Sequence, residues 1–143
     1  MALLSPQDEA TLKDHLSVVG HPVQLVLFTQ TIGGSETGAI AKQILDEVAA
    51  LNPKLTVVEK NFVLDTDDRA NYRVDKAPAI VILSDDVDTR MRMYGAPTGY
   101  EFVGLIEAII VAGTGKIELD PETMKWIQAV DKPTHIQVFS TPT

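Results

Sequence analysis

Apolar residues in this chain occur in two patterns, short continuous runs typical of buried strands and repeats at helical spacing. The order of these two patterns along the chain limits the folds that it can adopt. The run Val23–Thr29 is apolar and rich in β-branched residues, which is typical of a strand covered on both faces. After a turn at Gly33, Gly34 and Ser35, apolar residues recur at helical spacing over residues 36–51. A helix is predicted there, ending before Pro53. A buried strand is thus followed at once by an amphipathic helix.

The other segments extend this alternation. Ser5 and Pro6, followed by Asp8 and Glu9, form a helix start with a hydroxyl cap, proline at the first position and acids near the positive end of the dipole. The remaining predictions are a strand at 55–62, a short polar helix at 65–72, strands at 79–83 and 90–94 joined through an acidic turn at 85–88, and a helix at 100–111 ending at Gly113 and Gly115. The order is one helix and then β-α-β-α-β-β-α. This predicts an α/β thioredoxin-like (glutaredoxin-like) fold with a central mixed sheet and an extra N-terminal helix.

A pattern used early in the chain returns near its end. Residues 133–143 read like residues 22–32: both begin with proline, Leu25 and Leu27 match Ile136 and Val138, and Phe28 matches Phe139. The spacing is too long for a solenoid and favours a duplicated domain. We therefore expect one complete thioredoxin-like domain at 1–115. Residues 116–143 would hold a connecting helix and the first strand, from Ile136 to Phe139, of a second unit.

The composition excludes several classes of function. Lys and Arg number 12 against 20 Asp and Glu, so the net charge of -8 disfavours nucleic acid as a partner. The chain has no cysteine and three scattered histidines, so we expect no disulfide, no cysteine-ligated metal and no cofactor. The opening residues lack a secretory pattern and no apolar run is long enough to cross a bilayer, so we expect a cytoplasmic protein without a membrane partner.

Four segments, at residues 22–28, 72–82, 94–102 and 138–143, carry a resemblance that covers nearly the whole chain. The sequence resembles the two-unit, glutaredoxin-like protein disulfide oxidoreductases, and more distantly the N-terminal domain of the flavoprotein subunit of alkyl hydroperoxide reductase. The resemblance implies that Pro78, after Ala77, is the family's cis-proline, which places backbone beside the redox motif for pairing with a substrate peptide. It also implies that residues 138–143 lead into the Cys-x-x-Cys of a second unit. Tyr100 stands where the family commonly has histidine.

The redox motif itself is degenerate in this chain. A thioredoxin-type site has its first cysteine at the start of the first long helix, where backbone N–H groups and the helix dipole lower the thiol pKa. Ser35, Glu36, Thr37 and Gly38 occupy that location. Serine is a far weaker nucleophile and cannot form a disulfide, and Gly38 has no side chain where the resolving cysteine would be. We therefore expect no catalytic residue and no thiol–disulfide exchange by this chain alone.

Other chemistry at this turn is less well supported. A phosphate loop requires a lysine after its last glycine, but Ala39 follows Gly38; a nucleophile elbow requires glycine where Thr37 stands. The favoured interpretation is a helix start capped by Ser35 after a glycine-permissive turn. The acidic clusters at 65–68 and 85–88 lack the glycine and distal glutamate of a calcium loop, so no metal site is expected.

Three hypotheses of function follow. The first is a non-catalytic domain of a protein disulfide oxidoreductase, which packs against the second unit or another copy through its C-terminal strand and positions protein substrates. The second is a free-standing module that holds a peptide near Ser35 and Pro78 without redox chemistry. The third, weaker hypothesis is a hydrolase that uses Ser35.

Overall fold

A four-stranded mixed sheet forms the centre of the molecule. The computed structural model describes residues 1–141 and 143. The strands are β1 (Val23–Thr29), β2 (Leu55–Asn61), β3 (Ala79–Ser84) and β4 (Val87–Tyr94), in the order β2-β1-β3-β4. β2 runs parallel to β1, whereas β3 is antiparallel to both β1 and β4. The predicted mixed sheet and its element order are confirmed.

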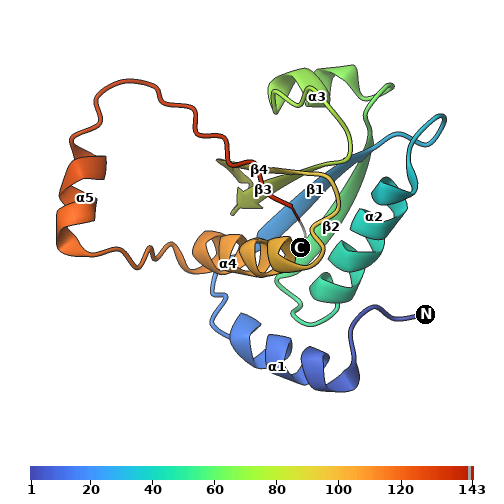
Figure 1. The fold of residues 1–143 in the computed structure, drawn as a ribbon, viewed down its shortest axis with the longest axis horizontal. Helices are drawn as coiled ribbons and strands as arrows, with labels where there is room; N and C mark the ends of the chain where they lie inside the picture. Colours follow the sequence, from blue (N-terminus) through green and yellow to red (C-terminus); the bar gives the residue numbers. More distant parts are fainter. Residues whose placement is uncertain (142) are drawn as a thin grey trace.

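Helices cover both faces of this sheet (Figure 1). They are α1 (Pro6–Leu16), α2 (Glu36–Ala49), α3 (Thr66–Asn71) and α4 (Tyr100–Thr114), whereas the remaining helix, α5 (Pro121–Gln128), lies away from the sheet. Each predicted helix is present, with ends that differ from the prediction by a few residues. Within the part of the chain that is described, no helix combines the length and the apolar character needed to cross a membrane.

The alternation of side chains along β1 divides the core into two layers. Leu25 and Leu27 pack with α1, α2 and α4, whereas Val26 and Phe28 pack on the opposite face with Val74 and the residues around α3. β1 is therefore buried on both faces, as its apolar sequence predicts. Figure 1 shows α3 on the other side of the sheet from α2 and α4.

The N-terminal helix is fixed by its own cap and by a close approach to α4. Ser5 and Asp8 form a capping box at the start of α1. Beyond the end of α1, the N–H groups of Gly20 and His21 both donate to the Gly113 carbonyl, at 2.8 and 2.9 Å. Gly113 allows this contact, because a Cβ built there would lie 2.6 Å from Cγ1 of Val19.

The hairpin of β3 and β4 is tighter than predicted. The acidic turn expected over 85–88 contains only Asp85 and Asp86, since β4 already begins at Val87. Both turn residues have positive φ, 48° and 63°, which suits the two-residue hairpin turn that matches the twist of the strands. β4 is consequently longer than the sequence pattern over 90–94 indicates.

The segment from Ile136 to Phe139 forms no strand in this chain, so its assignment as the first strand of a second unit stays a prediction. After α5, the described residues from Val130 onward form neither helix nor strand. A strand is defined by pairing with a neighbour, and no described strand pairs with this segment. Pro142, part of the repeated pattern, lies outside the described residues.

The contact between α1 and α4 can be tested with two glycines of α4. Gly113→Ala would force Cβ against the stiff side chain of Val19, and we expect it to lower the free energy of unfolding by about 1–3 kcal/mol. Gly104 faces open space, so Gly104→Ala should raise this free energy by roughly 0.5–1 kcal/mol. Urea unfolding of both variants measures the difference, and equal stability of the two would contradict the assigned packing.

Candidate functional site

The strand arrangement brings two distant turns to one edge of the sheet. β1 leads into the turn before α2, and its Phe28 pairs with Ala79, the first residue of β3. Pro78 therefore lies beside the end of β1. A pocket of about 240 Å³ forms between the two turns. Its lining consists of Gln30, Gly33, Gly34, Ser35, Gly38, Ala77 and Pro78.

The pocket joins most of the residues singled out in the sequence. Ser35 and Gly38 line one wall, and Ala77 and Pro78 line the opposite wall. Glu36 and Thr37 lie between Ser35 and Gly38 in the first turn of α2 but are not part of the lining. The Ala77–Pro78 peptide bond is cis. Among the described residues, no hydrogen bond is formed by the backbone N–H or C=O of Ala77.

The turn between β1 and α2 depends on two adjacent glycines. Gly33 has a φ of +73°, which glycine adopts without strain. At Gly34, a Cβ would lie only 1.7 Å from the carbonyl oxygen of Gln30. Any side chain at Gly34 would therefore displace the backbone that forms the pocket floor.

The first turn of α2 starts differently from the expected capped helix. Ser35 occupies the N-cap position with extended backbone, but its side chain makes no capping hydrogen bond. The expectation that the Ser35 side chain caps the helix is therefore wrong. The Gly38 N–H donates to the Ser35 carbonyl at 3.2 Å, so the backbone closes the first turn without the hydroxyl.

Gly38 has room for a side chain. A Cβ at this position would meet the side chain of Thr29 at 3.6 Å, an ordinary van der Waals distance. The packing of the site thus does not require glycine here. The space around position 38 would therefore accept a larger side chain, such as that of cysteine.

A wider groove of about 530 Å³ adjoins the pocket along α2. The two share Gln30, Gly34, Ser35 and Gly38. Thr29, only 8% exposed, donates its hydroxyl to Oε1 of Glu59 at 2.8 Å across the β1–β2 pair. The sequence analysis missed Gln30, Thr29 and Glu59. One feature of the sequence could have identified them: they lie at or near the carboxyl ends of two strands that are predicted from the apolar pattern.

The segment that carries Pro78 also contacts the end of β4. Gly95 donates its N–H to the Pro78 carbonyl at 2.9 Å, and Lys76 Nζ lies 5.0 Å from the centre of the Tyr94 ring. Burial raises the pKa of the Tyr94 phenol, and the nearby Asp75 carboxylate raises it further. Tyr94 therefore stays neutral at physiological pH.

The pocket lining has no titratable side chain, which limits its chemistry. None of the three histidines lines it, and His21 instead pairs with Asp85 at 2.9 Å on the hairpin. Ser35 consequently has no base within the lining to activate it. Among the described residues, no three His, Asp or Glu side chains lie together in a way that could hold a metal ion.

The chain is similar in sequence and in structure to known proteins. No protein-family model matches it. The F subunit of alkyl hydroperoxide reductase from Escherichia coli (strain K12) is 27% identical over 137 residues, covering 96% of this chain and 24% of that protein. The fold is thioredoxin-like.

Two solved structures support this assignment. The NTD_N/C domain of the alkyl hydroperoxide reductase AhpF of Enterococcus faecalis (V583) superposes with a TM-score of 0.81 at 22% identity, over 90% of this chain and 62% of that one. A protein disulfide oxidoreductase from Aeropyrum pernix k1 gives a TM-score of 0.76 at 20% identity, over 90% of this chain and 56% of that one. The chain spans less than two thirds of each of these two structures. The distant similarity expected from the sequence is confirmed.

The pKa of a thiol placed at Ser35 would report whether the site retains the electrostatics of a redox motif. We expect the cysteine of Ser35→Cys to have a pKa of about 7.5 or lower, against the ordinary value near 8.5, because helix N–H groups stabilise the thiolate. Ser17→Cys, at the exposed C-cap of α1, is a matched control whose pKa should not fall. Thiolate absorbance across a pH titration measures both. Equal pKa values would show that the start of α2 does not act on this position.

Proposed function

We propose that the chain is a non-catalytic thioredoxin-like domain of a protein disulfide oxidoreductase. In this function it provides structure and positions protein substrates, while a second thioredoxin-like unit supplies the redox Cys-x-x-Cys. Two of its solved relatives, the NTD_N/C domain and the disulfide oxidoreductase, are longer than the chain. In this proposal the redox activity belongs to the longer protein of which this chain is one domain, and not to the domain itself.

The observation that carries the proposal is a pocket with the backbone of a redox site and none of its thiols. The glycine turn, the start of α2 and the cis peptide bond before Pro78 all meet in one pocket. At the same time the chain has no cysteine, and Ser35 and Gly38 occupy the two positions that the resemblance assigns to the dithiol. A site of this kind can bind extended backbone but cannot exchange disulfides.

Exposed apolar side chains near the end of the chain support the second unit. Ile136, Val138 and Phe139 are 81%, 85% and 91% exposed, although they repeat residues that are buried in β1. Such a cluster is typical of a surface that another protein surface covers. All the described residues of the buried core precede residue 114. We accordingly propose a boundary near 115, with residues 116–143 connecting to and beginning the second unit.

A free-standing peptide-binding module is the second candidate. It is favoured by the backbone N–H and C=O groups of Ala77 at the pocket wall, which have no hydrogen-bond partner within the described chain, since an extended peptide can pair with such groups. This function requires no second unit. It leaves the exposed apolar side chains at 136–139 unexplained.

Insulin disulfide reduction tests the absence of redox chemistry in this domain. With dithiothreitol as reductant, we expect the unaltered chain to reduce insulin no faster than the reagent alone, because it has no thiol to relay electrons. The double variant Ser35→Cys/Gly38→Cys should increase the rate several-fold, because position 38 has room for a side chain and we expect the start of α2 to lower the pKa of the first thiol.

Two controls sharpen this assay. Ser35→Cys alone lacks a resolving thiol and should be trapped as a mixed disulfide with little turnover. Activity of the unaltered chain above the reagent background would refute a non-catalytic role. A double variant as inactive as the single one would show that the site has lost more than its cysteines.

The second unit is tested by the coding sequence that follows Thr143. We expect the reading frame to continue into a Cys-x-x-Cys motif, because residues 133–143 repeat the strand and turn that precede Ser35. Sequencing the genomic region measures this directly. A stop codon at that point would reject the two-unit proposal and favour the free-standing module.

A further inference from the structure

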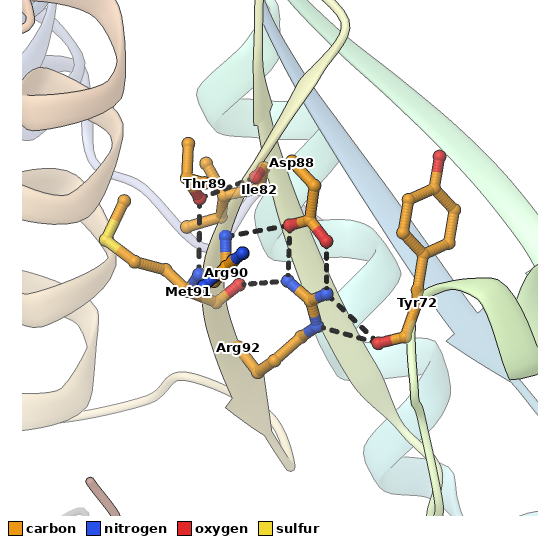
Figure 2. A network of polar contacts seen from close by, with 7 residues as sticks. All are labelled: Tyr72, Ile82, Asp88, Thr89, Arg90, Met91 and Arg92. Carbon is orange, nitrogen blue, oxygen red and sulfur yellow. Dashed lines mark hydrogen bonds and ion pairs between the residues drawn. The ribbon is translucent and has the colours of Figure 1, made fainter. Parts of the chain in front are cut away.

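Arg92, on the edge strand β4, is the centre of a polar network on the face of the sheet that carries α3. Its guanidinium donates to both oxygens of Asp88, with Nη1 at 2.8 Å from Oδ1 and Nη2 at 2.7 Å from Oδ2. Nε and Nη2 also donate to the Tyr72 carbonyl at 3.1 and 3.0 Å, and Nη1 donates to the Met91 carbonyl at 3.0 Å. Figure 2 shows the guanidinium between Asp88 and the Tyr72 carbonyl.

These contacts use all five N–H donors of the guanidinium. The Arg92 side chain is only 16% exposed, so an unpaired donor here would carry a desolvation cost. Two donors converge on the single carbonyl of Tyr72, the residue that ends α3. An arginine is needed for this arrangement, because a lysine ammonium cannot present the same planar fork.

The Tyr72 carbonyl lies at the start of the segment that leads to the pocket. The next residue, Arg73, has a φ of +54°, which turns the chain back toward the sheet. Val74 is then buried beside Phe28 and Ala79, and its N–H donates to the Arg69 carbonyl at 2.9 Å. The Tyr72 ring meets Phe28 edge-on, with the ring centres 6.3 Å apart.

The middle of the segment contacts β4 through the side chain of Tyr94, with Lys76 over its ring and Asp75 near its phenol. Asp75 and Lys76 are exposed and Ala77 is only partly buried. Beyond them, Pro78 is held by the Gly95 N–H at the end of β4. β4 thus contacts the segment at both ends, through Arg92 at Tyr72 and through Gly95 at Pro78.

We propose that Arg92 is a positioning residue that, by fixing the Tyr72 carbonyl, sets the path of residues 72–78 and so the placement of Ala77 and Pro78 at the pocket. Arg92 does not line the pocket and acts on it only through this segment. The part of the inference that concerns substrates rests on the proposed function, in which the pocket holds a peptide.

Hydrogen exchange tests the positioning without reference to function. Arg92→Lys keeps the positive charge but loses the fork, and we expect it to increase the exchange rate of the Gly95 amide about tenfold, the effect of losing about one hydrogen bond. The Phe62 amide donates to the Thr29 carbonyl at the other side of the sheet and should be unchanged. Exchange at Gly95 equal to that of the unaltered chain would overturn the inference.

Asp88→Asn separates this effect from general weakening of the hairpin. This variant removes the charge that pairs with Arg92 but leaves the two hydrogen bonds to the Tyr72 carbonyl in place. We expect exchange at Gly95 within about twofold of the unaltered chain, a much smaller effect than that of Arg92→Lys. An equal acceleration in both variants would show that Arg92 acts only through hairpin stability and would also overturn the inference.

A thiol reporter tests the consequence for substrates. In Ser35→Cys, the introduced thiolate attacks a short Ala-Val-Cys-Val-Ala peptide whose cysteine carries 2-nitro-5-thiobenzoate. A disulfide forms between the peptide and the introduced thiol, the bond to thiobenzoate breaks, and the coloured thiolate leaves. The quantity measured is a ratio, the rate with this peptide divided by the rate with the symmetrical small reagent 5,5′-dithiobis(2-nitrobenzoate). The small reagent does not require a peptide site.

Adding Arg92→Lys to Ser35→Cys should lower this ratio about tenfold and leave the rate with the small reagent unchanged. An unchanged ratio would overturn the proposed effect on substrates. A ratio for Ser35→Cys no higher than that of Ser17→Cys would refute the proposed substrate-holding function itself. Hydrogen exchange at Gly95 would still decide the role of Arg92 in that case.

Discussion

The placement of β1 at the centre of the sheet is the constraint on which the other parts depend. β1 has a hydrogen-bonded neighbour on each side and is buried on both faces, with Leu25 and Leu27 in one core layer and Val26 and Phe28 in the other. A central strand of this kind cannot slip by one residue without reversing every side chain. The turn after Thr29 is thereby fixed, and so is the position of Ser35 relative to the start of β3. The pocket results from this register.

The sequence predicted most of the fold and both walls of the pocket, because these depend on local signals. Apolar spacing indicates the helices and strands, and the pairs Gly33–Gly34 and Ala77–Pro78 indicate turns. Arg92 and Glu59 could not be assigned in this way, since their partners, Tyr72 and Thr29, are distant in sequence and reached only through the sheet. The segment from Ile136 to Phe139 forms no strand here for a related reason. Its apolar pattern matches that of β1, but a pattern gives no pairing partner, and the described part of the chain supplies none.

The backbone of the pocket does not depend on the side chain at position 38. A Cβ at position 34 would lie 1.7 Å from the carbonyl oxygen of Gln30. A Cβ at position 38 would lie 3.6 Å from the side chain of Thr29, an ordinary contact distance. The first glycine is required by the backbone and the second is not. A side chain at position 38 would therefore fit without moving the turn, the start of α2 or the Pro78 segment. Holding a partner or a substrate, the function proposed above, depends on this shape and not on a thiol.

The partly buried polar network around Arg92 lies on β4, outside the pocket lining. Burying a guanidinium is favourable only when its donors are satisfied, and a hydrophobic pair would stabilise a hairpin as well. Asp88 alone satisfies two of the donors of Arg92, which would be enough for a surface ion pair. The additional donors directed to the Tyr72 carbonyl connect β4 to the opposite end of the Pro78 segment. An ion pair that served only the hairpin would not need them, so the geometry of Arg92 is better explained by the segment that it holds than by the strand that carries it.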